Sequence, residues 1–137
     1  MKHATTDAKR SYSPAHDVQA APKLLSASTI TGDEVCNRQD EKLGTIQDIM
    51  LDTQSGKVRY AVLSSGGFLG MGDRLFAVPW SAFTLDAEHE RFILDMDADR
   101  LKAAPGFDKD AWPNMADATW NSTIESYYAA RSDARRI

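Results

Sequence analysis

The residues of this chain that are best spaced for chemistry are three aspartates. Asp95, Asp97 and Asp99 alternate along the sequence, as the first three carboxylate ligands of an EF-hand calcium loop do. Two other defining positions are wrong for calcium, because Arg100 stands where the turn needs glycine and Gly106 where the loop needs a bidentate glutamate. The end of a strand followed by a helix cap explains these carboxylates better, so no metal site is predicted here.

Other groups that could act in metal binding or catalysis are few. The three histidines, His3, His16 and His89, lie in an expected tail and an expected turn, and none shares a ligand spacing with a carboxylate or with Cys36. The lone Cys36 cannot form a disulfide within the chain, and its short strand context predicts a buried side chain. No Gly-x-Ser-x-Gly nucleophile motif occurs. The sequence therefore predicts no catalytic residue and no cofactor, and a protein that is not an enzyme.

A glycine-rich segment from Ser64 to Gly72 is the next candidate. Gly67 and Gly72 have the spacing of a phosphate-binding loop, but Asp73 follows where that loop needs lysine, and its carboxylate repels phosphate. The segment also carries three large apolar side chains. These either fold back over one end of a barrel or form an apolar tip that contacts a partner protein or a membrane surface. The three residues are Phe68, Leu69 and Met71.

The segments around this loop have the patterns of β-strands. Apolar residues fall on both faces near Ile49–Leu51, which indicates a strand covered on both sides. The residues of Asp52–Gly56 favour a turn, and Lys57–Ser64 is enriched in β-branched and aromatic residues. We therefore expect a mainly β fold, a small antiparallel barrel. Its other strands are predicted around 34–37, up to Trp80, over 81–85 and over 91–96.

Two helices are expected after the strands. Asp97 or Asp99 can cap a short helix through Leu101, which must stop before Pro105. A final helix, capped by Asp117 or Thr119, reaches about Ala130, and its large side chains recur on one face. This face either covers the barrel or packs against a second copy of the chain. Its residues are Trp120, Ile124, Tyr127 and Tyr128.

A series of short motifs keeps a constant order between Lys23 and Asp97. The motifs are Leu25–Ala27 as an opening strand, Gly32 with Val35, Lys42–Ile46, Asp48, Gly56, Tyr60–Val62, Gly66–Gly70 and Ala77–Trp80. In this order they resemble the PRC-barrel domain, which is shared by the photosynthetic reaction-centre H subunit, ribosome maturation factors and small stand-alone bacterial proteins. The segment from Leu101 to Tyr128 is similar to that of stand-alone members. The resemblance implies a compact PRC-type β-barrel used for protein contacts, with no common catalytic motif.

The chain divides into four parts by composition. We expect a disordered tail over residues 1–22, a barrel domain over 23–97, a helical extension over 98–130 that packs on the barrel or on a second subunit, and a tail over 131–137. Charge follows this division. The whole chain has a net charge of −4, whereas residues 23–130 hold ten basic and seventeen acidic residues, a net charge of −7. An acidic body argues against a nucleic-acid partner, whose phosphates need lysine and arginine.

These observations predict a protein-interaction or assembly module that forms homo-oligomers and has an unidentified protein partner. No run of about 18 apolar residues occurs, so we expect a cytoplasmic protein without a transmembrane segment, and peripheral association with a membrane complex stays an alternative. The expected contact residues are Phe68, Leu69, Met71, Trp120, Ile124, Tyr127 and Tyr128. The alternative function is a small-ligand-binding barrel. Its apolar pocket would lie between the barrel and the final helix, lined by Trp112, Trp120 and Tyr127.

Overall fold

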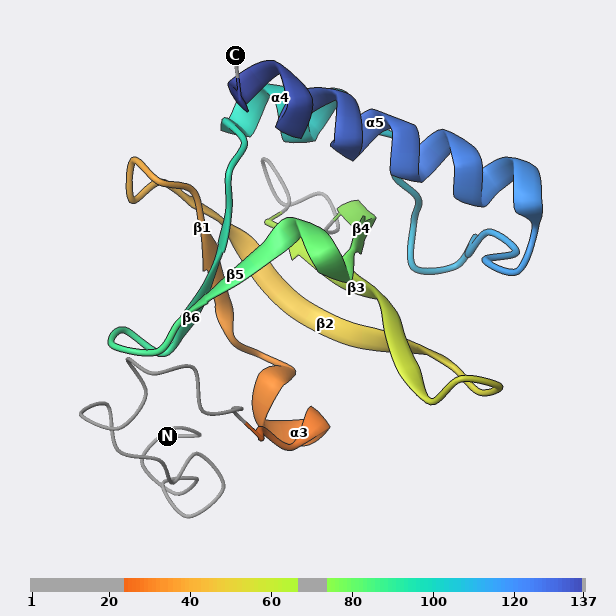
Figure 1. The fold of residues 1–137 in the computed structure, drawn as a ribbon, viewed down its shortest axis with the longest axis horizontal. Coiled ribbons are helices and arrows are strands. Elements are labelled where there is room, and N and C mark those ends of the chain that lie inside the picture. The colour runs from red at the N-terminus through yellow and green to blue at the C-terminus, as the bar shows by residue number, and fades with distance from the viewer. Residues whose placement is uncertain (1–23, 67–73, 137) are drawn as a thin grey trace.

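A computed structural model describes residues 24–66 and 74–136 of this chain (Figure 1). Six strands form one curled sheet with the order β4-β3-β2-β1-β6-β5. All neighbouring strands are antiparallel except β1 and β6, which are parallel. The strands are β1 (Glu34–Cys36), β2 (Lys42–Asp52), β3 (Lys57–Ser65), β4 (Arg74–Pro79), β5 (Phe83–Asp86) and β6 (Arg91–Leu94). The helices are α3 (Ala27–Ile30), the short 3-10 helix η1 (Trp80–Ala82), α4 (Ala98–Ala103) and α5 (Ala118–Arg136). The predicted mainly β fold with a short helix and a C-terminal helix is confirmed.

The two long strands, β2 and β3, give the sheet its curvature. One end of β2 pairs with β1 and the other with β3, and the β2–β3 register shifts twice, between Ile46 and Asp48 and between Met50 and Leu51. Such bulges increase the local twist of a strand pair. In Figure 1 the hairpin that joins β2 and β3 extends past the other strands of the sheet, because β1 and β4 pair only with the parts of β2 and β3 away from the turn.

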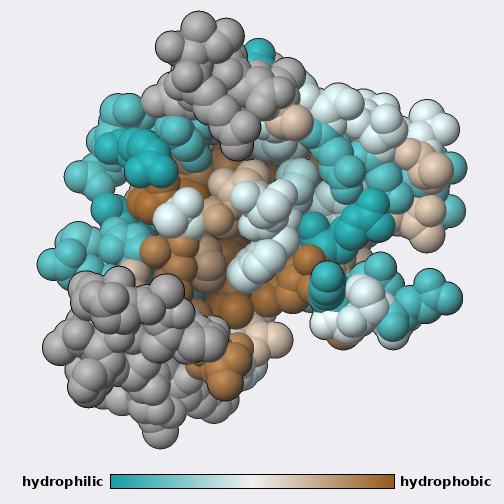
Figure 2. Space-filling view, viewed as in Figure 1, coloured by the Kyte–Doolittle hydropathy of each residue, from teal (hydrophilic) through white to brown (hydrophobic). Residues whose placement is uncertain are grey.

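The core lies inside the curled sheet and beneath α5, which packs against β4 and η1. Val62 and Leu63 on β3 are both fully buried, although they are neighbours and face opposite ways, so the middle of this strand is covered on both sides. Cys36 is 3% exposed, which confirms the predicted burial, and this burial together with the nearby Glu34 carboxylate raises its pKa. Figure 2 shows the hydrophobic residues along the middle of the molecule, with hydrophilic residues around them.

The predicted turn chemistry is confirmed at the β2–β3 hairpin. Asp52 Oδ1 accepts hydrogen bonds from the backbone N–H groups of Gln54, at 2.9 Å, and Ser55, at 3.3 Å. Gly56 has a φ of +77°, a conformation that glycine adopts without a steric penalty. The turn therefore forms from local hydrogen bonds alone.

For α4 and for α5, the structure shows which of the two predicted residues caps the helix. Asp97 caps α4 by accepting a 2.8 Å hydrogen bond from the backbone N–H of Arg100. This bond places one of the three alternating aspartates at a helix cap, as expected. Asp117 caps α5, where its carboxylate accepts a 2.8 Å bond from the backbone N–H of Trp120. No helix among the described residues combines the length and apolar character that a membrane crossing requires.

Three boundaries predicted from the sequence are wrong. The opening strand predicted over Leu25–Ala27 does not form, because the Ser26 hydroxyl accepts a hydrogen bond from Thr29 N and caps α3, which begins at Ala27. The strand predicted over 81–85 begins only at Phe83, after η1. The final helix does not end near Ala130 but continues to Arg136, so residues 131–136 are helical rather than a tail.

Candidate functional site

A groove lies between the β2–β3 hairpin and the start of α5. Its volume is about 360 Å³, and we call it the hairpin groove. Most of its lining comes from the end of β2, the start of β3 and the segment that enters α5. The lining residues are Met50, Leu51, Asp52, Thr53, Arg59, Tyr60, Met115, Ala116 and Asn121.

The apolar part of the groove comes from a local irregularity of the hairpin. Met50 pairs with Tyr60, but the next pair joins Leu51 to Val58, so Arg59 is an extra residue on β3. A bulge of this kind redirects the side chains next to it. Leu51 is 55% exposed and Met50 is half-buried. The prediction of a strand covered on both faces is therefore wrong at the hairpin end of β2.

Tyr60 and Trp120 join the hairpin to α5. The Tyr60 hydroxyl donates a 2.6 Å hydrogen bond to Asn121 Oδ1, and the same hydroxyl lies 3.3 Å from Glu125 Oε2. The rings of Tyr60 and Trp120 meet edge to face with centroids 5.3 Å apart. Arg59 Nη2 lies 3.2 Å from Glu125 Oε2, and both of these side chains are about half exposed. One wall of the groove is thus fixed to the other by a buried hydroxyl, an aromatic contact and an exposed ion pair.

Charges are held in place at the rim of the groove. The backbone N–H groups of Gln54 and Ser55 lower the pKa of Asp52, so its carboxylate is ionised at neutral pH. Burial and the neighbouring Glu125 carboxylate raise the pKa of Tyr60 to about 12, which keeps its phenol protonated and able to donate. The groove therefore combines an apolar floor with the carboxylate of Asp52 and the guanidinium of Arg59, and Glu125 contacts Arg59 from α5.

The contact residues predicted on the final helix are used within the chain. Ile124 is 1% exposed and Tyr128 is 4% exposed, while Trp120 and Tyr127 are half-buried against the core. Ile124 and Tyr128 are thus covered within one chain, and contact of this helix with a second copy stays a prediction. The three residues predicted on the glycine-rich loop, Phe68, Leu69 and Met71, lie outside the described residues.

Tyr127 also ties α5 to α4. Its hydroxyl donates a 2.5 Å hydrogen bond to the carbonyl oxygen of Arg100. The Arg100 guanidinium lies over the Tyr127 ring, 4.9 Å from its centroid, in a cation–π contact. The half-buried tyrosine therefore has a partner for its polar end and for its ring within the chain.

The three residues named for the predicted ligand pocket each contact a different partner among the described residues. Trp112 is 40% exposed and packs edge to face on Phe107 at 5.2 Å, whereas Trp120 contacts Tyr60 and Tyr127 contacts Arg100. None of the three lines the hairpin groove. Sequence reasoning missed Met50, Leu51 and Met115. The signal for the first two was two adjacent apolar residues on a strand that was about to turn.

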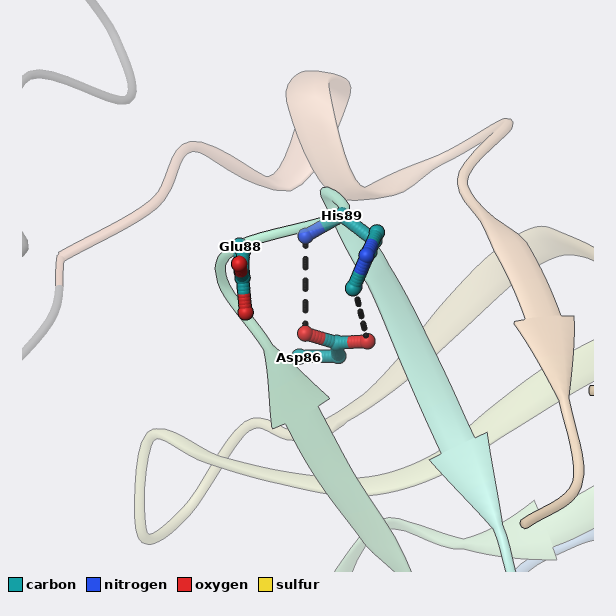
Figure 3. A group of neighbouring side chains, drawn as sticks. All are labelled: Asp86, Glu88 and His89. Atoms are coloured by element: carbon teal, nitrogen blue, oxygen red, sulfur yellow. Dashed lines mark hydrogen bonds and ion pairs between the residues drawn. The ribbon is translucent and has the colours of Figure 1, made fainter.

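A second cluster lies in the turn between β5 and β6. Figure 3 shows Asp86, Glu88 and His89, whose potential ligand atoms all lie within 4.8 Å of one another. The sequence did not predict this proximity of His89 to Asp86. Asp86 Oδ2 lies 2.9 Å from His89 Nδ1 and 2.9 Å from Arg91 Nε. The same Arg91 reaches Asp40 Oδ1 at 2.7 Å.

These contacts do not fit a metal ion. Burial by itself would raise the pKa of Asp86, but hydrogen bonds from Arg91 and His89 outweigh this effect and lower it. A cation at the carboxylate would have to compete with the guanidinium that already neutralises it. The arrangement is that of a hairpin turn whose Asp86 is held by Arg91 at the start of β6, and Arg91 is held in turn by Asp40 in the β1–β2 turn.

Comparison with known proteins agrees with this architecture. The PRC-barrel domain family model matches residues 22–101 of the chain. Among solved structures, RimM of Pseudomonas aeruginosa, described as a proposed 16S ribosomal RNA processing protein, is 19% identical with a TM-score of 0.38. That match covers 59% of this chain and 48% of the RimM chain, so this chain spans about half the length of that structure. No curated protein matches the chain.

Proposed function

The chain belongs to the PRC-barrel domain family, and from this premise we propose that it is a non-catalytic protein-interaction module with a role in assembly. In this proposal residues 23–97 form the contact domain, and residues 98–130 form an extension that packs on it. The partner is a protein, because the acidic charge of residues 23–130 disfavours nucleic acid.

The single observation that carries this proposal is the exposed apolar floor of the hairpin groove. Leu51 presents more than half of its surface to solvent beside Met50 and Met115, and the charged Asp52 and Arg59 also line the groove. Methionine and aromatic residues are enriched at the centres of protein interfaces, where a polar rim surrounds them. The groove has this composition, which favours a protein contact over a small polar ligand.

The glycine-rich loop is a second contact surface in the proposal. Phe68, Leu69 and Met71 supply three large apolar side chains over four residues, a composition suited to an apolar contact tip. The loop and the groove can be tested separately, because Ser65 and Gly66, which lead into the loop, do not line the groove.

Site-specific photo-crosslinking in living cells tests the proposal. A photoreactive amino acid is placed at Leu51, at Phe68 or, as the control, at Leu24, which is 85% exposed and does not line the groove. We expect a discrete adduct from position 51 or 68 that position 24 does not give. The crosslinked protein is then purified and must bind the wild-type chain in solution. If positions 51 and 68 yield only the adducts seen from position 24, the chain does not use these surfaces for protein contacts and the proposal fails.

A further inference from the structure

We propose that the hairpin groove binds a second copy of this chain, so that two copies pair through their β2–β3 hairpins. This inference rests on the proposed function, since it names the partner of one of the two surfaces. It requires an apolar area that needs cover, a charge pattern that attracts a copy of itself, and a geometry in which both copies use the same residues.

The apolar area is concentrated at the tip of the groove. Leu51 is one of three large apolar side chains that are strongly exposed among the described residues, with Leu24 and Trp112. Leu51 lies beside a hollow that Met50 and Met115 also line. A leucine from a second copy can therefore fill the hollow while its own groove receives the leucine of the first. Burial of this apolar surface is what would hold the two copies together.

The charge pattern of the hairpin favours a second copy over an oppositely charged partner. Between Asp48 and Arg59 the hairpin carries two carboxylates, Asp48 and Asp52, and two cations, Lys57 and Arg59, so its net charge is zero. The body as a whole carries −7 over residues 23–130, the difference between ten basic and seventeen acidic residues. Two copies of an acidic protein repel each other over most of their surfaces. Two copies can approach each other at the hairpin, where the net charge is zero and acidic and basic side chains are both present.

The two signs are also separated along the hairpin. The acidic side chains come from β2 and its end, and the basic ones come from β3. A two-fold axis makes each contact occur twice, so a residue on one copy meets a different residue on the other. In the pair that we propose, Asp52 of each copy faces Arg59 of the other. Arg59 can reach a second carboxylate, because its contact with Glu125 is a single 3.2 Å approach between two half-exposed side chains.

Sedimentation analysis of the full chain over a range of concentrations tests the proposal. We expect a monomer–dimer equilibrium for the wild type and at least about tenfold weaker association for Leu51→Asp, which places a charge in the apolar contact. The matched control is Leu24→Asp, the same change at a more exposed leucine away from the groove, and it is expected to leave the equilibrium unchanged. Thermal unfolding of each variant checks the fold. Since Leu51 is more than half exposed, the melting temperature of the Leu51→Asp variant should stay close to that of the wild type.

A charge exchange gives a second and independent measurement. Asp52→Arg makes the facing pair two cations, and Arg59→Asp makes it two carboxylates, so each variant alone should dimerise less than the wild type. An equimolar mixture of the two variants restores both opposite-charge pairs, and we expect it to associate more tightly than either variant does by itself. Restoration on mixing depends on a contact between copies and cannot arise from the ion pair within one copy.

Two results would overturn the inference. One is a wild-type chain that stays monomeric at every concentration. The other is a dimer that Leu51→Asp does not weaken and whose charge variants gain nothing on mixing. If the wild type is monomeric but position 51 crosslinks to a different protein, the proposed function stands and only the second-copy assignment is lost.

Discussion

The hydroxyl of Tyr60, on β3 close to the hairpin, donates a 2.6 Å hydrogen bond to the side-chain oxygen of Asn121, near the start of α5. The two residues are 61 positions apart in the sequence. This bond closes the base of the hairpin groove, because Tyr60 and Asn121 both line it. The shape of the groove therefore depends on how α5 is docked, and changes at this junction should be measurable in the stability of the whole chain.

Removing the Tyr60 hydroxyl should cost a modest amount of stability. Tyr60→Phe keeps the ring that packs on Trp120 but loses the bond to Asn121, and the expected loss is about 1 kcal/mol in the free energy of unfolding. Denaturant titration measures it. Tyr127→Phe is the matched control at the other end of α5, since it removes one tyrosine bond to a backbone oxygen and should cost a similar amount. A Tyr60→Phe variant as stable as the wild type would mean that the bond adds nothing.

Stability should fall as the solution becomes strongly alkaline. Burial raises the pKa of Tyr60 from 10.0 to about 12. The folded chain then binds the phenolic proton more tightly than the unfolded chain does, so the stability gained is complete below pH 10 and is lost between pH 10 and about pH 12. Burial raises the pKa of Tyr128 as well, and its hydroxyl adds a loss in the same direction.

The measurement is the free energy of unfolding as a function of pH for the wild type and for Tyr60→Phe. The difference between the two chains isolates the contribution of Tyr60 from that of every other group in the chain. We expect the wild type to lose more stability than the variant across this window. Parallel pH curves for the two chains would contradict the raised pKa.

Gly44 should tolerate no side chain. A Cβ at this position would lie 2.2 Å from the backbone oxygen of Ser64 on β3, so the backbone itself would have to move. Overpacking of this kind costs about 1–3 kcal/mol or more, and Gly44→Ala should show it as a lower denaturant midpoint. Gly56→Ala is the comparison, because nothing lies within 4 Å of its Cβ and only its φ of +77° is unfavourable. Its cost should be about 1 kcal/mol. Equal losses for the two variants would contradict the steric explanation.

Because one face of α5 is buried, shortening the Ile124 side chain should cause a large loss of stability. This side chain is 1% exposed in the core, so Ile124→Ala should lower the free energy of unfolding by about 2–5 kcal/mol. Ser122→Ala, on the exposed side of the same helix, should change it by less than about 0.5 kcal/mol. A mild loss at Ile124, similar to that at Ser122, would show that α5 is not part of the folded core.

Local patterns were enough to predict much of the β structure. The turn at Asp52–Gly56 depends on a side chain that bonds the next two backbone N–H groups and on a glycine with positive φ, all within five residues. The cap of α4 depends on Asp97 and a backbone N–H three residues later. Interactions of this range are encoded by neighbouring residues, so composition and spacing reveal them.

Local patterns mislead where two signals compete or where burial depends on distant elements. Ser26 can cap a helix, but the family resemblance predicts a strand over Leu25–Ala27, and the cap prevails. The apolar neighbours of Leu51 predict that it is covered, but it is 55% exposed. Whether a strand residue is covered depends on what packs on it, and the hairpin of β2 and β3 extends past the other strands (Figure 1).

The class of the fold, the central strands, the hairpin turn and the amphipathic final helix follow from patterns within the sequence. The docking of separate elements places Ile124 and Tyr128 in the core and gathers Met50, Leu51 and Met115 at one groove. The same docking brings Arg91, which pairs with Asp86, against Asp40. Strand alternation, turns and caps arise between residues close in sequence. A groove, a buried helix face or an ion-pair network arises where separate elements dock, and that docking minimises exposed apolar surface over the whole chain.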